Sequence, residues 1–220
     1  MGVIFGTFEF LLAQRGSICF YFTMSYLNDL RVAIEELRTP NCEGDKYFIP
    51  QEPLHSLMTP GLLKNVLPEC RIALQHMPEA VTEVLSSLRK IFALLVISGE
   101  AEMIINFMTQ DQLQVSPMDQ KLPFSLEQFA KIFPSKTANY KIRSLFDKQW
   151  EFITPVFSGK VVARALADKI ILPIVEEKEI GDGGFGTIYE IKVYEGYCSF
   201  DGTQPDAVRS YGRQFCVGVC

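Results

Sequence analysis

The sequence has no run of basic residues and no long apolar run. Its 21 Lys and Arg are outnumbered by 26 Asp and Glu, which gives a formal net charge of −5. A nucleic-acid-binding face needs an excess of Lys and Arg, so this balance argues against a nucleic-acid partner. The apolar stretch 3–22 is interrupted by Glu9, Gln14 and Arg15, and falls short of the roughly 18 residues of a spanning helix. We therefore expect no nucleic acid and no membrane among its partners.

Metal-binding and disulfide patterns are also missing. The six cysteines form no C-x-x-C pair, and the only histidines are His55 and His76, so the spacing predicts no zinc site. No positively charged start precedes the apolar stretch 3–22, as a secretory signal would require. We expect reduced thiols and a cytoplasmic location. His55 is expected at the surface and His76 at a helix end.

An amphipathic helix is the first clear element. Between Ser25 and Leu37, apolar residues recur on one stripe, as in a helix that faces a core. Because Met24 directly precedes this helix, we interpret residues 1–23 as an apolar extension of doubtful origin and Met24 as the start. The stripe consists of Leu27, Leu30, Ile34 and Leu37.

Helical patterns continue to about residue 150. The four prolines of 39–60 predict a loop. Apolar residues at helical spacing from Pro78 to Ile97 predict one central helix, which Gly99 can end. Ser125 and Gln128 make a capping box for a later helix, and 139–150 predicts another, with Trp150 as a core anchor.

After residue 150 the period changes to that of β-strands. The sequence therefore predicts an α+β chain, in which a helical domain at 24–150 is followed by a β connector at 151–175. The final unit, 176–220, contains the most informative stretch. Its glycines at 181, 183 and 186 have the spacing G-x-G-x-x-G. Glycine lets a backbone turn tightly and approach a ligand closely.

The residues around these glycines distinguish between two nucleotide-binding arrangements. From Tyr189 to Val193, apolar and polar residues alternate as in a strand, and 174–180 reads as a strand before the glycines. A dinucleotide-binding fold needs a helix after its glycines. The glycines therefore join two antiparallel strands of a hairpin, and an ordinary hairpin with glycines chosen for turn geometry stays the simplest alternative.

With Phe185 and Ile188 the pattern becomes G-x-G-x-F-G-x-I, which resembles the nucleotide-covering loop of protein kinases. The resemblance implies that ATP lies against this hairpin, with adenine packed on Ile180 and Ile188. It places the phosphates under the backbone of 182–186, with Phe185 closing the turn. The residues that it assigns to ATP are Ile180, Gly181, Asp182, Gly183, Gly184, Phe185, Gly186 and Ile188.

The other kinase elements are missing from the sequence. A kinase has a Lys in a V-A-I-K setting, a Glu that pairs with it, and H-R-D and D-F-G motifs. The nearest run here, 207–209, has Arg209 in place of that Lys, and no H-R-D or D-F-G follows. Without a base and metal carboxylates, phosphoryl transfer cannot be positioned. We expect a truncated small lobe of a serine/threonine kinase-like protein at 176–220, with weak ATP binding, no catalytic residues and no Mg²⁺ ligands of its own.

The helical part gives a second, looser resemblance. Its runs Leu88-Arg-Lys-Ile-Phe-Ala and Phe146-Asp-Lys-Gln-Trp, with Leu172-Pro173 after them, resemble the region before the kinase domain in fungal kinase-like proteins. That resemblance implies no defined activity. The alternatives are a non-catalytic interaction or regulatory module, which binds a protein partner through the helical domain, and a truncated gene product. We expect the last 20 or so residues to be poorly packed.

Overall fold

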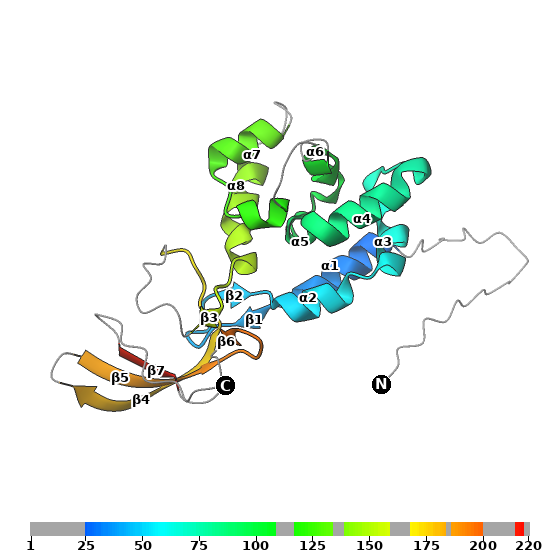
Figure 1. Cartoon of the computed structure of the whole chain (residues 1–220). Coiled ribbons are helices and arrows are strands. Elements are labelled where there is room, and N and C mark those ends of the chain that lie inside the picture. The colour runs from blue at the N-terminus through cyan, green and yellow to red at the C-terminus, as the bar shows by residue number, and fades with distance from the viewer. Residues whose placement is uncertain are drawn as a thin grey trace, which may run out of the picture.

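The computed structural model describes residues 25–108, 117–133, 139–158, 168–183, 186–199 and 214–217. Its helices gather in one bundle, and a small sheet extends away from them (Figure 1). The mixed α and β composition predicted from the sequence is thus present. The suspected extension 1–23 lies outside the described residues.

The first helix agrees with its prediction. α1 spans Tyr26–Glu36, and Ser25 caps it by accepting a hydrogen bond from the backbone N–H of Asn28 at 3.1 Å. Leu30 and Ile34 are buried in the core, and the other two residues of the stripe pack against it. The periodicity of this segment therefore identified both the helix and its buried face.

Further helices complete the bundle, and α5 lies at its centre. Residues 91–97 are buried without interruption, as their nearly uniform apolar character predicts. The α-helices are α2 Gln51–Leu57, α3 Pro60–Val66, α4 Met77–Ser87, α5 Arg89–Ile97, α6 Ile104–Met108, α7 Leu126–Ile132 and α8 Asn139–Lys148. Short 3-10 turns are η1 Leu67–Cys70, η2 Leu74–His76, η3 Ala101–Met103, η5 Met118–Lys121 and η6 Gln149–Phe152.

The single helix expected from Pro78 to Ile97 is wrong, because the chain breaks at Leu88. That residue has φ −123° and ψ 15°, outside the helical region. The carboxylate of Asp119 accepts hydrogen bonds from the backbone N–H groups of Lys90 and Ile91, at 2.9 and 3.0 Å. By accepting these two N–H groups, the Asp119 side chain satisfies the N-terminus of a new helix. Gly99, with φ 73°, ends α5 as predicted.

The loop expected at 39–60 is also wrong in part. It contains α2 and two short antiparallel strands, β1 Thr39–Pro40 and β2 Tyr47–Phe48. The prolines do not break these helices because they fall at their beginnings. Pro53 lies in the first turn of α2, and Pro60 is the first residue of α3, where a missing N–H costs little.

The C-terminal part is built from short sheets. β3 Phe157–Ser158 pairs in parallel with β6 Cys198–Ser199, and β4 Ile174–Gly183 pairs with β5 Gly186–Val193 in an antiparallel hairpin. β7, Gln214–Val217, adds to β5 in parallel. These four residues therefore have strand pairing, although we expected the end of the chain to be poorly packed; residues 200–213 and 218–220 lie outside the described ranges.

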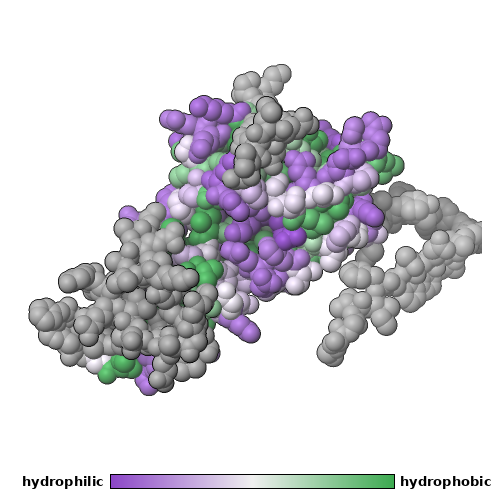
Figure 2. All heavy atoms as spheres, viewed as in Figure 1, coloured by the Kyte–Doolittle hydropathy of each residue, from purple (hydrophilic) through white to green (hydrophobic). Residues whose placement is uncertain are grey.

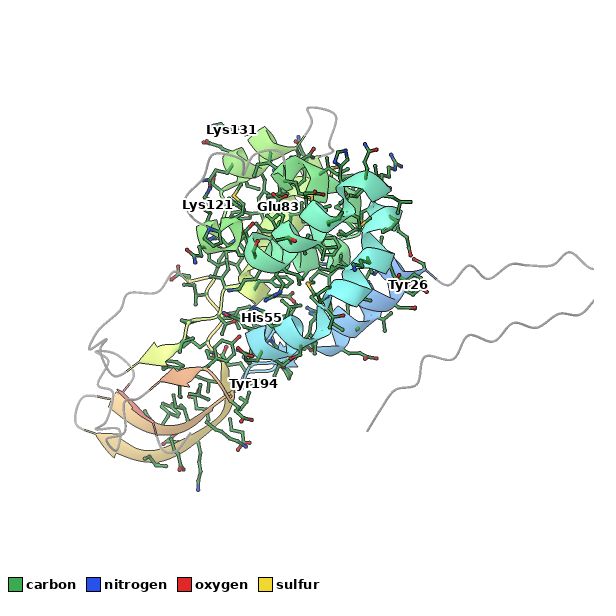
Figure 3. The ribbon with its side chains drawn as sticks, turned by 45° about the vertical axis from the view of Figure 1, so that its right-hand side comes forward. Tyr26, His55, Glu83, Lys121, Lys131 and Tyr194 are labelled. Atoms are coloured by element: carbon green, nitrogen blue, oxygen red, sulfur yellow. The ribbon has the colours of Figure 1, made fainter. Side chains whose placement is uncertain are left out.

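A second hydrophobic core joins the hairpin to the helical part. It contains Phe48 from β2 together with residues from the base of the hairpin, and Trp150 packs against it. The Phe48 ring makes edge-to-face contacts with Tyr194 and Tyr197, at centroid distances of 5.6 and 6.0 Å. Figure 3 shows Tyr194 where the hairpin meets the helices. The base of the hairpin is thus held in part by Phe48, which precedes β4 by more than 100 positions.

The visible surface of the helical part is mostly hydrophilic, with hydrophobic side chains scattered over it (Figure 2). Among the described residues, none of the helices combines the length and the apolar character needed to cross a bilayer.

Candidate nucleotide-binding hairpin

The predicted glycine hairpin is present. The antiparallel register of β4 and β5 continues to the pair Gly183 and Gly186, at the far end from the helical part. Gly181 lies within β4, and no helix follows Gly186, because β5 runs on to Val193. The prediction of strand, glycines and strand is therefore confirmed. Gly184 and Phe185, which the resemblance assigns to ATP, lie outside the described residues.

Ile180 lies at a β-bulge. Glu179 pairs with Tyr189, and the next pair is Gly181 with Ile188, so Ile180 is the extra residue of β4. A bulge interrupts the pleat and redirects the side chain that it contains. Ile180 remains 53% exposed. An apolar surface is therefore left open next to the first glycine of the motif.

Gly181 directly follows the bulge in β4, and two common structural reasons for a glycine are missing there. Its φ is outside the left-handed region, and a Cβ built on it would have no heavy atom within 4 Å. Left-handed backbone geometry and crowding are two structural causes of a glycine, and both are missing at this position, although glycine in a strand also often marks a bulge. Approach of a ligand to the backbone is a remaining reason for glycine here.

The hairpin has one packed face and one open face. Ile191 and Val193 are buried in the second core, whereas Glu190 and Lys192 are exposed. On the open face the ammonium group of Lys192 pairs with Glu176, and Lys178 lies opposite Glu190. The negative charges of these two carboxylates equal the positive charges of the two ammonium groups in number. The open face therefore offers no excess of positive charge to a triphosphate.

A pocket of about 630 Å³ lies beside the base of the hairpin, and residues Cys42, Val175 and Ile191 contribute to its lining. Its charged lining consists of three glutamates and two lysines, so it has no excess of positive charge for an anion: Glu176, Glu177, Glu190, Lys178 and Lys192. Neither Ile180 nor Gly181, the two assigned positions whose side chains the structure describes, lines it.

Nucleophilic chemistry is not supported at the nearby cysteine. The Cys42 thiol donates a hydrogen bond to Glu177 Oε2 at 3.5 Å, and burial, with this carboxylate, raises the pKa of Cys42. Burial raises the pKa of Cys70 to about 12. A protonated thiol is a poor nucleophile.

The expectation of reduced thiols is wrong for Cys198, which is disulfide-bonded.

Both histidines are exposed, His55 in α2 and His76 at the start of α4, as the sequence indicated. Partial burial of the His55 ring, followed by the positive charge of Arg89, lowers the pKa of His55.

In the described part of the chain, no group of three His, Cys, Asp or Glu side chains could hold a metal ion. Arg209, the substitute for the kinase lysine, lies outside that part.

Sequence reasoning missed the residues that position the hairpin, namely Phe48, Tyr194 and Tyr197. A run of aromatic residues after β5 was the available signal, but nothing indicated that Phe48 would meet it. Comparisons of the chain with models of protein families, with curated proteins and with solved structures gave no match. An assignment of function must therefore be argued from the hairpin itself.

Proposed function

We propose that this chain is a protein-kinase-like nucleotide-binding protein, in which the hairpin of β4 and β5 binds ATP. The observation that supports this most is Gly181, where φ lies outside the left-handed region and an added Cβ would meet no heavy atom of the described residues within 4 Å. The exposed aliphatic side chain of Ile180, next to it, adds an apolar surface for a planar base.

In the proposed complex, adenine packs on Ile180 and Ile188, and the phosphates accept hydrogen bonds from backbone N–H groups of 182–186. The backbone would carry the recognition, because the charges of the open face balance. A hairpin supplies one wall of a site, whereas most small-molecule sites enclose their ligand. We expect a dissociation constant on the order of 1 mM. Phosphotransfer is not proposed, because no catalytic base or Mg²⁺ ligand has been assigned in this chain.

The test is a titration of the purified chain with ATP, with and without Mg²⁺, followed by the amide NMR signals of 174–193. Gly181→Ala adds a methyl group that the protein itself does not contact, so the fold should stay unchanged while ATP binding weakens. Gly181→Val should abolish binding. Gly61→Ala, in α3, is the matched control, because it tests a glycine remote from the hairpin. Equal ATP binding by wild type and both Gly181 variants would remove the basis of the proposal.

The alternative function is a non-catalytic interaction module that binds a protein through its helices. The balanced charges of the open face favour it, since a nucleotide site generally contains excess positive charge. The same titration separates the two proposals. If the hairpin signals do not move at several millimolar ATP, the interaction module is the better interpretation.

A further inference from the structure

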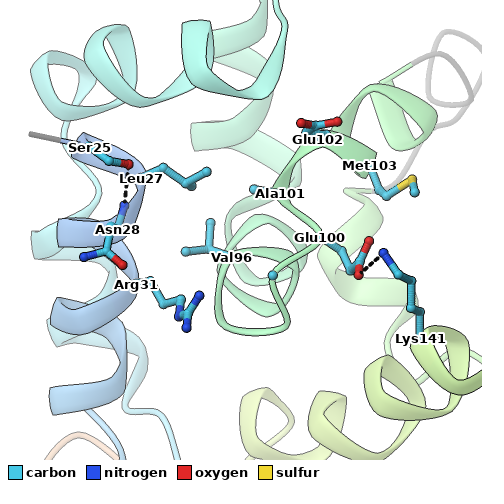
Figure 4. Close-up of a pocket in the computed structure, with 11 residues that line it drawn as sticks. Ser25, Leu27, Asn28, Arg31, Val96, Glu100, Ala101, Glu102, Met103 and Lys141 are labelled. Atoms are coloured by element: carbon cyan, nitrogen blue, oxygen red, sulfur yellow. Dashed lines mark hydrogen bonds and ion pairs between the residues drawn. The ribbon is translucent and has the colours of Figure 1, made fainter. Parts of the chain in front are cut away.

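A second pocket lies in the helical part, far along the chain from the hairpin. It has a volume of about 480 Å³ and lies between α1, the turn after α5 and the start of α8 (Figure 4). Pockets of roughly 300–1,000 Å³ are typical of small-molecule sites. The pocket is therefore large enough for a small organic ligand.

The pocket has an apolar floor. Leu27 of α1 and Met103 of η3 are half-buried and pack against the main core, and Val96 of α5, which is buried, lies close to Leu27 (Figure 4). These three side chains come from three different elements that the core holds in place. An apolar chain that lies on this floor would remove the remaining surface of Leu27 and Met103 from water.

The charged side chains around the floor differ in how closely they are paired with one another. Lys141 of α8 is held by Glu100 at 2.6 Å, and Glu102 is paired with Arg71 at 3.2 Å. Arg31 of α1 contacts Glu35 at 3.6 Å, in a pair whose side chains are 49% and 51% exposed. Exposed pairs of this kind contribute little to stability.

Arg31 is therefore the charged group most available to a ligand. Its side chain projects from α1 into the pocket, on the side opposite the Glu100–Lys141 pair (Figure 4). The N-terminal N–H groups of α1 do not contribute, because Ser25 and the carboxylate of Glu69 already accept their hydrogen bonds. A guanidinium group matches a carboxylate with two parallel hydrogen bonds.

We propose that this pocket binds an amphipathic carboxylate, such as a short fatty acid. Its carboxylate pairs with Arg31, and its apolar chain lies on Leu27, Val96 and Met103. The proposal is independent of ATP binding, since no described residue of the hairpin lines this pocket. It assigns to the helical part a ligand class that the glycine motif does not indicate.

The experiment uses the full chain with ¹³C-labelled methionine methyl groups and titrates it with octanoate. Met103 lines the pocket, and its signal can be assigned from Met103→Leu. We expect a saturable shift of this signal, while Met58 and Met118, buried elsewhere in the core, do not move. Arg31→Gln should weaken octanoate binding by about tenfold or more. Arg143→Gln is the matched control, because Arg143 is exposed on α8 and does not line the pocket.

Octanol and octyltrimethylammonium separate recognition of the carboxylate from simple apolar adsorption. Neither should shift Met103 at the concentrations at which octanoate saturates. The proposal is overturned if octanol binds as tightly as octanoate, if Arg31→Gln binds octanoate like the wild type, or if the Met103 signal does not move. Circular dichroism of Arg31→Gln checks that the helices are retained. Arg31→Lys keeps the positive charge but loses the two parallel donors of the guanidinium group, and should bind octanoate with intermediate affinity.

Discussion

The side-chain amide of Gln149 makes hydrogen bonds to both backbone groups of Phe124. Its Oε1 accepts from the Phe124 N–H at 2.7 Å, and its Nε2 donates to the Phe124 carbonyl at 2.9 Å. Nε2 also donates to the carbonyl of Phe146 at 3.0 Å. Gln149 is fully buried, so these contacts replace water for a stretch of backbone that enters the core without regular secondary structure.

Gln149→Leu should therefore destabilise the protein strongly. It leaves the N–H and the carbonyl of Phe124 buried without partners, which we expect to lower the free energy of unfolding by about 3 kcal/mol. The measurement is the midpoint of urea unfolding, followed by circular dichroism. Gln120→Leu, at an exposed position of η5, should change the midpoint little. Similar midpoints for both variants would mean that the Gln149 amide does not support this backbone.

Phe48→Ala should loosen the hairpin while the helices stay folded. The substitution empties the centre of the second core and removes the contacts of Phe48 with Tyr194 and Tyr197. Truncation of a buried Phe typically costs about 3–5 kcal/mol. Hydrogen exchange should therefore become faster at the amides of 186–193 and remain slow in α5. Unchanged exchange in β5 would show that the hairpin is held in another way.

The carboxylate of Asp119 should give a pH dependence of opposite sign to that of an ordinary salt-bridged acid. Burial raises the pKa of Asp119 above its ordinary value of 3.8, although the N–H groups of Lys90 and Ile91 oppose this shift. The folded state then binds this proton more tightly than the unfolded state. The stability due to Asp119 is present at low pH and is lost as the pH rises through the raised pKa.

Urea unfolding of the wild type and Asp119→Asn across a pH series tests this sign. The stability of the wild type relative to the variant should fall as the pH rises above about 4, because only the wild type ionises there. A relative stability that increases with pH would show that the hydrogen bonds from the helix N-terminus outweigh the effect of burial.

Arg38 and Glu151 join the end of α1 to η6 with two parallel hydrogen bonds, at 2.8 and 2.9 Å. The Arg38 guanidinium also lies 4.7 Å from the centroid of the Tyr47 ring. Arg38→Lys keeps the charge but loses the second hydrogen bond and the planar stacking, and should cost about 1 kcal/mol. Thermal unfolding measures the loss, with Arg143→Lys as the exposed control. Equal melting temperatures of the two variants would contradict a role for the fork geometry.

Local patterns predicted local structure well. The stripe of α1 needed only the spacing of its leucines and isoleucine. The capping box of α7 is formed as expected, with both bonds between Ser125 and Gln128 present at 3.2 and 2.7 Å. The glycine hairpin was predictable because the strands on both sides have a period of two. In each case the residues that determine the structure lie within a few positions of one another.

Contacts between residues that are far apart in the sequence explain most of the differences between the predicted and the observed structure. The break at Leu88 depends on Asp119, which reaches the start of α5 from 28 positions beyond Ile91. The segment 39–60 was interpreted as a loop from its prolines, and its packing onto the hairpin base could not be read from its own sequence. Trp150 does anchor a core, but the second one rather than that of the helical bundle.

β4 is an outer strand of the sheet in the described part of the chain, and its form affects how the protein behaves in concentrated solution. It contains irregularities at Val175 and Ile180, and charged residues occupy 176–179. Bulges and charges on an outer strand hinder another molecule from adding a strand of its own. Copies of this protein are therefore hindered from joining one another edge to edge through β4, even where they are crowded.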